Sequence, residues 1–98
     1  MSDPTTDPDE QPRPIAFTYE DRELILKLYS IDAETENRFK LAMVAGNKLV
    51  VQMNAYDLDE LLGAIAAVAN HEKNSKQRNK LDALFKRVSD KLEKEFPQ

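Results

Sequence analysis

Residues 38–54 contain two short stretches in which apolar and polar side chains alternate, on either side of Ala45-Gly46-Asn47. Alternation of this kind puts every second residue on one face of the chain and is typical of half-buried β-strands. Two such stretches so close together predict an antiparallel β-hairpin. The large apolar residues of its buried face are Phe39, Leu41 and Met43 in the first stretch, and Leu49, Val51 and Met53 in the second.

The register of this hairpin depends on the length of its loop. A three-residue loop, 45–47, pairs Met43 with Leu49 and brings all six large apolar residues onto one face. A two-residue loop pairs Met43 with Val50 instead and mixes polar with apolar residues on each face. Because a slip of one residue exchanges the two faces of a strand, we expect the three-residue loop, closed by Asn47 in the left-handed conformation.

Three segments with apolar residues at helical spacing surround the hairpin. The first runs from about residue 19 to 30 and follows Thr18, whose hydroxyl can cap it. The second begins near Asn54 to Asp57, with Asp57 as the first residue of a potential capping box, and the third carries its apolar stripe over residues 81–96. The expected order is α-β-β-α-α, which is a small α+β domain with one antiparallel hairpin packed on helices.

The first sixteen residues differ in character from the rest of the chain. They are acidic and contain four prolines, at positions 4, 8, 12 and 14. They lack the apolar area that would offset the entropy lost on ordering. We therefore expect a disordered acidic tail over residues 1–16 and a single α+β domain over residues 17–97.

Residues 70–80, NHEKNSKQRNK, contain no apolar side chain although they join two amphipathic segments. Cations at the start of a helix oppose its dipole, and local conflicts of this kind tend to occur at functional sites. The segment is either a turn, with Asn74 as the helix cap and Gln77 closing a capping box, or solvent-exposed helix without a break. We favour the turn, because folding back buries both apolar stripes. The cations of residues 73–80 are Lys73, Lys76, Arg78 and Lys80.

The second helical segment has small side chains on one face, where Gly63 and Ala67 are four residues apart. Small residues at this spacing permit the close approach of another backbone. We expect them to serve tight packing within the domain, and the alternative is a helix-to-helix dimer seam.

Several kinds of chemistry are excluded by composition. Without cysteine the chain has no disulfide and no cysteine-ligated zinc, so we expect a reducing, cytoplasmic location. Its two glycines are too few for a phosphate-binding glycine-rich loop. His71 is the only histidine and does not begin an HExxH motif, because Ser75 occupies the position of the second histidine. We expect no enzymatic activity, no catalytic residue, and no cofactor or metal.

The remaining features favour a protein that works by binding another protein or a second copy of itself. A lone hairpin leaves both edges open, and its outer face carries Ala42, Val44 and Val50, which favour a dimer edge. The alternative is a nucleic-acid or phosphate-binding accessory protein that uses residues 73–80. The net charge of −4 and the lack of aromatic platforms beside those cations make this alternative weaker. No apolar run approaches the length of a membrane span, so we expect no membrane partner.

Overall fold

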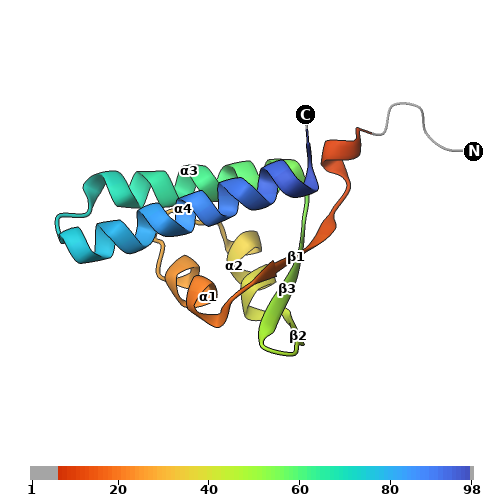
Figure 1. The fold of residues 1–98 in the computed structure, drawn as a ribbon, viewed down its shortest axis with the longest axis horizontal. Helices are drawn as coiled ribbons and strands as arrows, with labels where there is room; N and C mark the ends of the chain where they lie inside the picture. The colour runs from red at the N-terminus through yellow and green to blue at the C-terminus, as the bar shows by residue number, and fades with distance from the viewer. Residues whose placement is uncertain (1–6, 98) are drawn as a thin grey trace, which may run out of the picture.

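The computed structural model describes residues 7–97, which form a small α+β fold (Figure 1). An antiparallel sheet and a hairpin that leads into two long helices confirm the predicted class. A strand and a second short helix add to the predicted order. The elements are a 3₁₀ turn η1 (Pro8–Glu10), β1 (Arg13–Phe17), α1 (Tyr19–Leu26), α2 (Ala33–Lys40), β2 (Met43–Ala45), β3 (Lys48–Met53), α3 (Ala55–His71) and α4 (Ser75–Glu95).

Strand β3 is the centre of the sheet, whose order is β1-β3-β2. Strand β1 pairs antiparallel with β3 and places Ile15 opposite Val51 and Phe17 opposite Leu49. These four side chains are buried beneath the helices. The prediction of a disordered tail up to residue 16 is therefore wrong for residues 13–16, because the alternation of Ile15 and Phe17 supplies a buried face. Residues 1–6 of the predicted tail lie outside the described residues.

Helix α2 occupies a position where the sequence analysis expected the first hairpin strand to begin. The predicted first helix, 19–30, ends at Leu26, and a second helix begins after Asp32, whose carboxylate accepts from the Thr35 N–H at 3.0 Å. Charges at i, i+4 spacing stabilise this short helix. The pairs are Glu34 with Arg38 and Glu36 with Lys40, each at 2.6 Å.

The hairpin has the two-residue loop, so the predicted register is wrong. Met43 pairs with Val50, and Ala45 pairs with Lys48 across Gly46-Asn47. Gly46, and not Asn47, adopts a positive φ of 63°. A glycine with positive φ at the first central position is typical of a type II′ turn, whose twist suits a hairpin. Phe39 belongs to helix α2, which places its side chain in the core. Strand β2 begins only at Met43, so the register of the hairpin does not depend on Phe39.

Helices α3 and α4 form an antiparallel pair that lies along one side of the sheet and of α1 (Figure 1). Asn54 caps α3 and shares a capping box with Asp57, three residues before the predicted start of that box. The predicted turn between the helices is confirmed, since α3 ends at His71 and Asn74 caps α4. Within residues 7–97, no helix combines the length and the hydrophobicity of a membrane span.

An ion pair between the buried Asp21 and the half-buried Arg87 attaches α1 to α4. Asp21 is 1% exposed, and its carboxylate accepts from the Arg87 guanidinium at 2.7 Å and from the Thr18 N–H at 3.2 Å. The next turn of α4 places the Lys91 ammonium 5.5 Å from the centroid of the Phe17 ring. Burial lowers the pKa of Lys91 below its ordinary value. A carboxylate this deeply buried depends on its partners, because an unpaired buried charge is strongly unfavourable.

Replacing Arg87 should test this dependence. We expect Arg87→Met to lower the free energy of unfolding by about 2 kcal/mol, because Asp21 keeps its burial and loses its cation. Arg78→Met is the matched control, since Arg78 is exposed on the same helix and forms no ion pair within residues 7–97. Urea unfolding of both variants measures the difference, and equal stability of the two would contradict the role of Arg87.

The two glycines should respond in opposite directions to alanine. A Cβ at Gly63 meets no atom within 4 Å, so Gly63→Ala should raise the free energy of unfolding by about 1 kcal/mol through helix propensity. Gly46→Ala should lower it by about 1 kcal/mol, because a side chain is strained at positive φ. Thermal and urea unfolding measure both changes, and a destabilising Gly63→Ala would show that the small side of α3 is in fact tightly packed.

Candidate functional site

Three large apolar side chains are exposed together where α2 passes into β2. Leu41 is 83% exposed, Met43 is 72% exposed and Val44 is 61% exposed. We call Leu41, Met43 and Val44 the β2 patch. Single exposed apolar residues are ordinary on protein surfaces, but three within four positions favour contact with another molecule. Because successive residues of a strand point to opposite faces, Met43 lies on one face of this edge strand and Val44 on the other.

The backbone of β2 is open beside this patch. In a two-residue hairpin the residues that flank the loop, Ala45 and Lys48, exchange hydrogen bonds, so the next pair along, Val44 and Leu49, does not. The N–H and the C=O of Val44 therefore point away from β3. Since β2 is the last strand on this side of the sheet formed by residues 7–97, both groups are available to a further strand.

The opposite edge of the sheet, β1, is less suited to pairing. The same alternation directs the backbone groups of Pro14 and Ala16 away from β3. Proline has no N–H to donate, and its presence in an edge strand is a common way to prevent pairing with another chain. The two edges of this sheet thus differ, with a proline at one and an unobstructed valine at the other.

The candidate dimer edge from the sequence analysis is corrected by this topology. Val50 lies in the central strand, between Ala16 of β1 and Met43 of β2, and cannot be part of an edge. Val44 lies on the edge strand as expected, and half-buried Ala42 is the residue directly before that strand. Leu41 and Met43 were assigned to the core by the alternation, so the sequence analysis missed the two most exposed members of the β2 patch.

A hollow of about 560 Å³ separates the outer part of α2 from strands β2 and β3. Two members of the β2 patch, Leu41 and Met43, border it together with the half-buried Ala42 and Val50. On the α2 side its wall is polar, formed by Glu34, Asn37 and Arg38. The exposed apolar surface of the patch therefore continues into a concave region.

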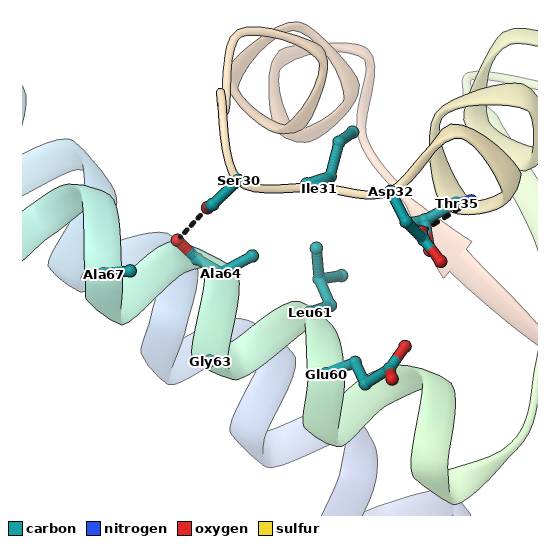
Figure 2. A pocket seen from close by; sticks show the side chains of 9 residues that line it. All are labelled: Ser30, Ile31, Asp32, Thr35, Glu60, Leu61, Gly63, Ala64 and Ala67. Atoms are coloured by element: carbon teal, nitrogen blue, oxygen red, sulfur yellow. Dashed lines mark hydrogen bonds between the residues drawn. The ribbon is translucent and has the colours of Figure 1, made fainter.

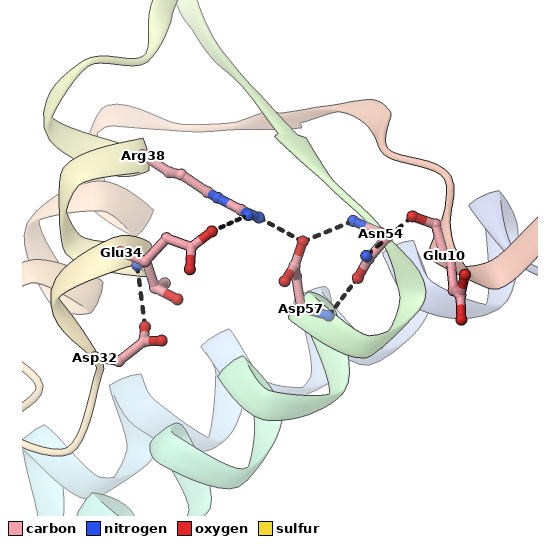
Figure 3. Close-up of polar contacts among 7 residues, drawn as sticks. Glu10, Asp32, Glu34, Arg38, Asn54 and Asp57 are labelled. Atoms are coloured by element: carbon pink, nitrogen blue, oxygen red, sulfur yellow. Dashed lines mark hydrogen bonds and ion pairs between the residues drawn. The ribbon is translucent and has the colours of Figure 1, made fainter.

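Helix α2 is held beside this hollow by Arg38 (Figure 3). The guanidinium of Arg38 donates to the Asp57 carboxylate and, at 2.6 Å, to that of Glu34. Asp57 also accepts from the Asn54 N–H at 3.0 Å, so one carboxylate joins α2 to the start of α3. The hydrogen bond to Asp57 is the main cause that raises the pKa of Arg38, and Glu34 adds to it. This network fixes the end of α2, from which Leu41 emerges.

Residues 70–80 comprise the end of α3, the turn that contains Lys73, and the first turns of α4, which carry Lys76, Arg78 and Lys80. All four of these cations are exposed. Asn74 caps α4 by accepting from the N–H groups of Lys76 and Gln77 at 3.0 and 3.1 Å. The Asn74 N–H donates to Glu72 at 3.1 Å, which takes the place of the capping box predicted with Gln77. Lys76 and Lys80 lie one turn apart on one side of α4, whereas Arg78 points elsewhere. The structure brings together only part of the predicted set Lys73, Lys76, Arg78 and Lys80.

The side of α3 that carries the small residues Gly63, Ala64 and Ala67 faces the connection between α1 and α2 (Figure 2). The Ser30 hydroxyl donates to the Ala64 carbonyl at 3.0 Å. Beside this contact is a hollow of about 370 Å³, which Gly63, Ala67 and Asp32 help to line. Ala64 is half-buried and packs against the core, whereas exposed Gly63 and half-buried Ala67 border the hollow. A Cβ at Gly63 would meet no atom within 4 Å, so the predicted close packing is wrong for Gly63.

Comparisons with known protein families, with curated proteins and with solved structures each found no match. Within residues 7–97, no three histidine, aspartate or glutamate side chains converge in a way that could hold a metal ion. His71 is exposed at the last position of α3. The β2 patch and its open edge combine exposed apolar side chains with outward-pointing backbone groups.

Proposed function

We propose that this chain is a non-enzymatic interaction module that forms a homodimer by pairing its β2 strands. The observation that carries the proposal is the open N–H and C=O of Val44 in the middle of an exposed apolar strand. A two-fold dimer uses the same surface on both copies and is the commonest form of oligomer. The proposal follows from both features together. The open backbone groups supply hydrogen bonds between the copies, and the exposed side chains supply apolar area to bury.

The geometry of such a dimer is simple. Antiparallel pairing about a two-fold axis at Val44 lets that residue exchange both backbone hydrogen bonds with its counterpart. The strand order becomes β1-β3-β2-β2-β3-β1 across the two copies, and both outer edges then carry Pro14. The two hairpins lie side by side, with helices covering one face of each half.

The stability of this dimer must come mainly from apolar burial. Strand β2 has three residues, and net hydrogen-bond contributions of about 1 kcal/mol each cannot hold two chains together. Leu41, Met43 and Val44 add apolar area, at about 25 cal/mol for each Å² removed from water. We infer that the backbone fixes the register of the dimer and that the β2 patch supplies most of its free energy.

Proline substitution at matched edge positions tests this interface. Val44→Pro removes the outward N–H without removing a hydrogen bond between β2 and β3, and should convert the dimer into a monomer of 11.2 kDa. Ala16→Pro makes the same change at the opposite edge and should leave the dimer intact. Light scattering at two concentrations about tenfold apart measures the mass, and circular dichroism confirms that both variants are folded.

Charge substitution supplies a second arm of this experiment. Met43→Lys should weaken the dimer by placing a cation within the buried patch, whereas Tyr29→Lys changes an exposed aromatic residue elsewhere and should have no effect. A wild-type mass of 11.2 kDa at both concentrations would contradict the dimer. A dimer that survives both Val44→Pro and Met43→Lys would contradict this interface.

A second candidate function is phosphate or nucleic-acid binding by the turn between α3 and α4. It is supported by Lys76 and Lys80, which lie on one side of α4 close to its N-terminus, where the helix dipole also attracts anions. Neither lysine forms an ion pair within the part of the chain that the structure describes.

This candidate predicts weak binding that decreases steeply with salt. Fluorescence anisotropy with labelled single-stranded and duplex DNA at low salt should show binding that Lys76→Glu/Lys80→Glu abolishes. Lys86→Glu/Lys94→Glu, an equal charge change farther along α4, should retain it. Absence of binding by the wild-type chain at low salt, or equal loss in the two variants, would contradict a role for this turn.

A further inference from the structure

A second groove lies at the end of the molecule where the start of α3 meets the end of α4. Its volume is about 550 Å³, which is within the range of pockets that accept ligand groups. The floor and walls are largely apolar, and they are formed by Ala55, Tyr56, Leu92, Phe96 and Pro97. Tyr56 is exposed and Leu92 is half-buried, so apolar surface is accessible within the groove.

The polar lining of this groove has a single sign. Asp9, Asp59 and Glu93 are the charged residues that line it, and no lysine or arginine does. The Arg13 guanidinium lies 5.2 Å from the centroid of the Phe96 ring without lining the groove. An apolar surface with only carboxylates around it attracts positively charged groups.

Asp9 lines this groove, and the segment around it, residues 7–10, is held in place. The Tyr56 hydroxyl donates to the Asp7 carboxylate at 2.7 Å, and the side-chain amide of Asn54 donates to the Glu10 carbonyl at 3.1 Å. The hydrogen bond to Asp7 raises the pKa of Tyr56, and the charges of Asp9 and Glu10 raise it further. The phenol of Tyr56 therefore lies among several carboxylates.

We propose that this groove binds a segment of a partner protein that presents an apolar side chain flanked by lysine or arginine. The apolar side chain occupies the space between Tyr56 and Leu92, and the flanking cations pair with Asp9, Asp59 and Glu93. Complementary charge at the rim of an apolar site provides specificity and speeds association. The groove is formed by the α3 and α4 ends and by η1, so it does not depend on pairing of the β2 strands.

A second copy of this chain is a poor occupant. Its most basic segment, residues 70–80, has no apolar side chain to insert into the groove. Its most exposed apolar feature, the β2 patch, is preceded by Lys40, which already pairs with Glu36, and is followed by a single cation, Lys48, in residues 41–53. A separate partner therefore fits the chemistry of the groove better than self-association does.

The test uses the full chain and two synthetic helical peptides with the same leucine pattern, one with lysine and one with glutamate at the polar positions. Nitrogen-15 NMR spectra should show the lysine peptide shifting the amide signals of Tyr56, Asp59 and Glu93, with affinity that decreases as salt is added. The glutamate peptide should not bind. Glu93→Lys should weaken binding about tenfold or more, whereas Asp82→Lys, an equal change at an exposed position on the same helix, should not.

Four results would overturn the proposal. These are no binding of the lysine peptide, signal changes that lie away from Tyr56 and Glu93, equal binding of the glutamate peptide, and equal loss of affinity in Glu93→Lys and Asp82→Lys. A dimer that dissociates on Glu93→Lys would show that a second copy occupies the groove, which also contradicts a separate partner. Because the β2 variants leave this groove unchanged, failure of the dimer and failure of the groove are distinguishable.

Discussion

The contact between Phe17 and Phe39 determines how the rest of this small fold is arranged. Their ring centroids lie 4.9 Å apart at an interplanar angle of 70°, the edge-to-face geometry that aromatic pairs prefer. Phe17 comes from β1 and Phe39 from α2, and both are buried. Because α2 places its aromatic side chain in the core, only residues 43–45 are left to form a short edge strand with little buried surface. The exposed β2 patch is thus a consequence of this contact.

Two polar contacts keep the helices in the positions that the aromatic pair requires. Arg38 joins α2 to the start of α3 through Asp57, and Arg87 joins α4 to α1 through Asp21. Each pair connects segments distant in sequence, and the deeply buried Asp21 is also bonded within its own helix cap. A domain of this size buries a limited apolar area, so such pairs add directional restraint where the core alone would allow neighbouring helices to shift.

Long elements could be predicted from the sequence, and short ones could not. The helices α3 and α4, the Thr18 cap and the turn at Asn74 each follow from periodicity sustained over many residues or from a specific capping residue. Residues 39–43 carry apolar side chains at every second position, which over so few residues does not separate a strand from a helix end. The i, i+4 charges Glu34 and Arg38 were the available signal for α2. The β2 patch was missed for the same reason, since a wrong register assigns exposed residues to the core.

The difference between the two sheet edges limits the kind of assembly that this chain can form. A sheet with two open edges can add strands at both sides without end, which leads to fibres. Here Pro14 directs no N–H outward from β1, whereas Val44 directs both of its backbone groups outward from β2. Pairing at β2 therefore uses the edge in residues 7–97 whose outward backbone groups no proline interrupts, and the resulting two-fold pair presents a proline at each outer strand. An association of this kind closes at two chains, with the acidic groove of each copy still accessible because it lies on elements outside the sheet.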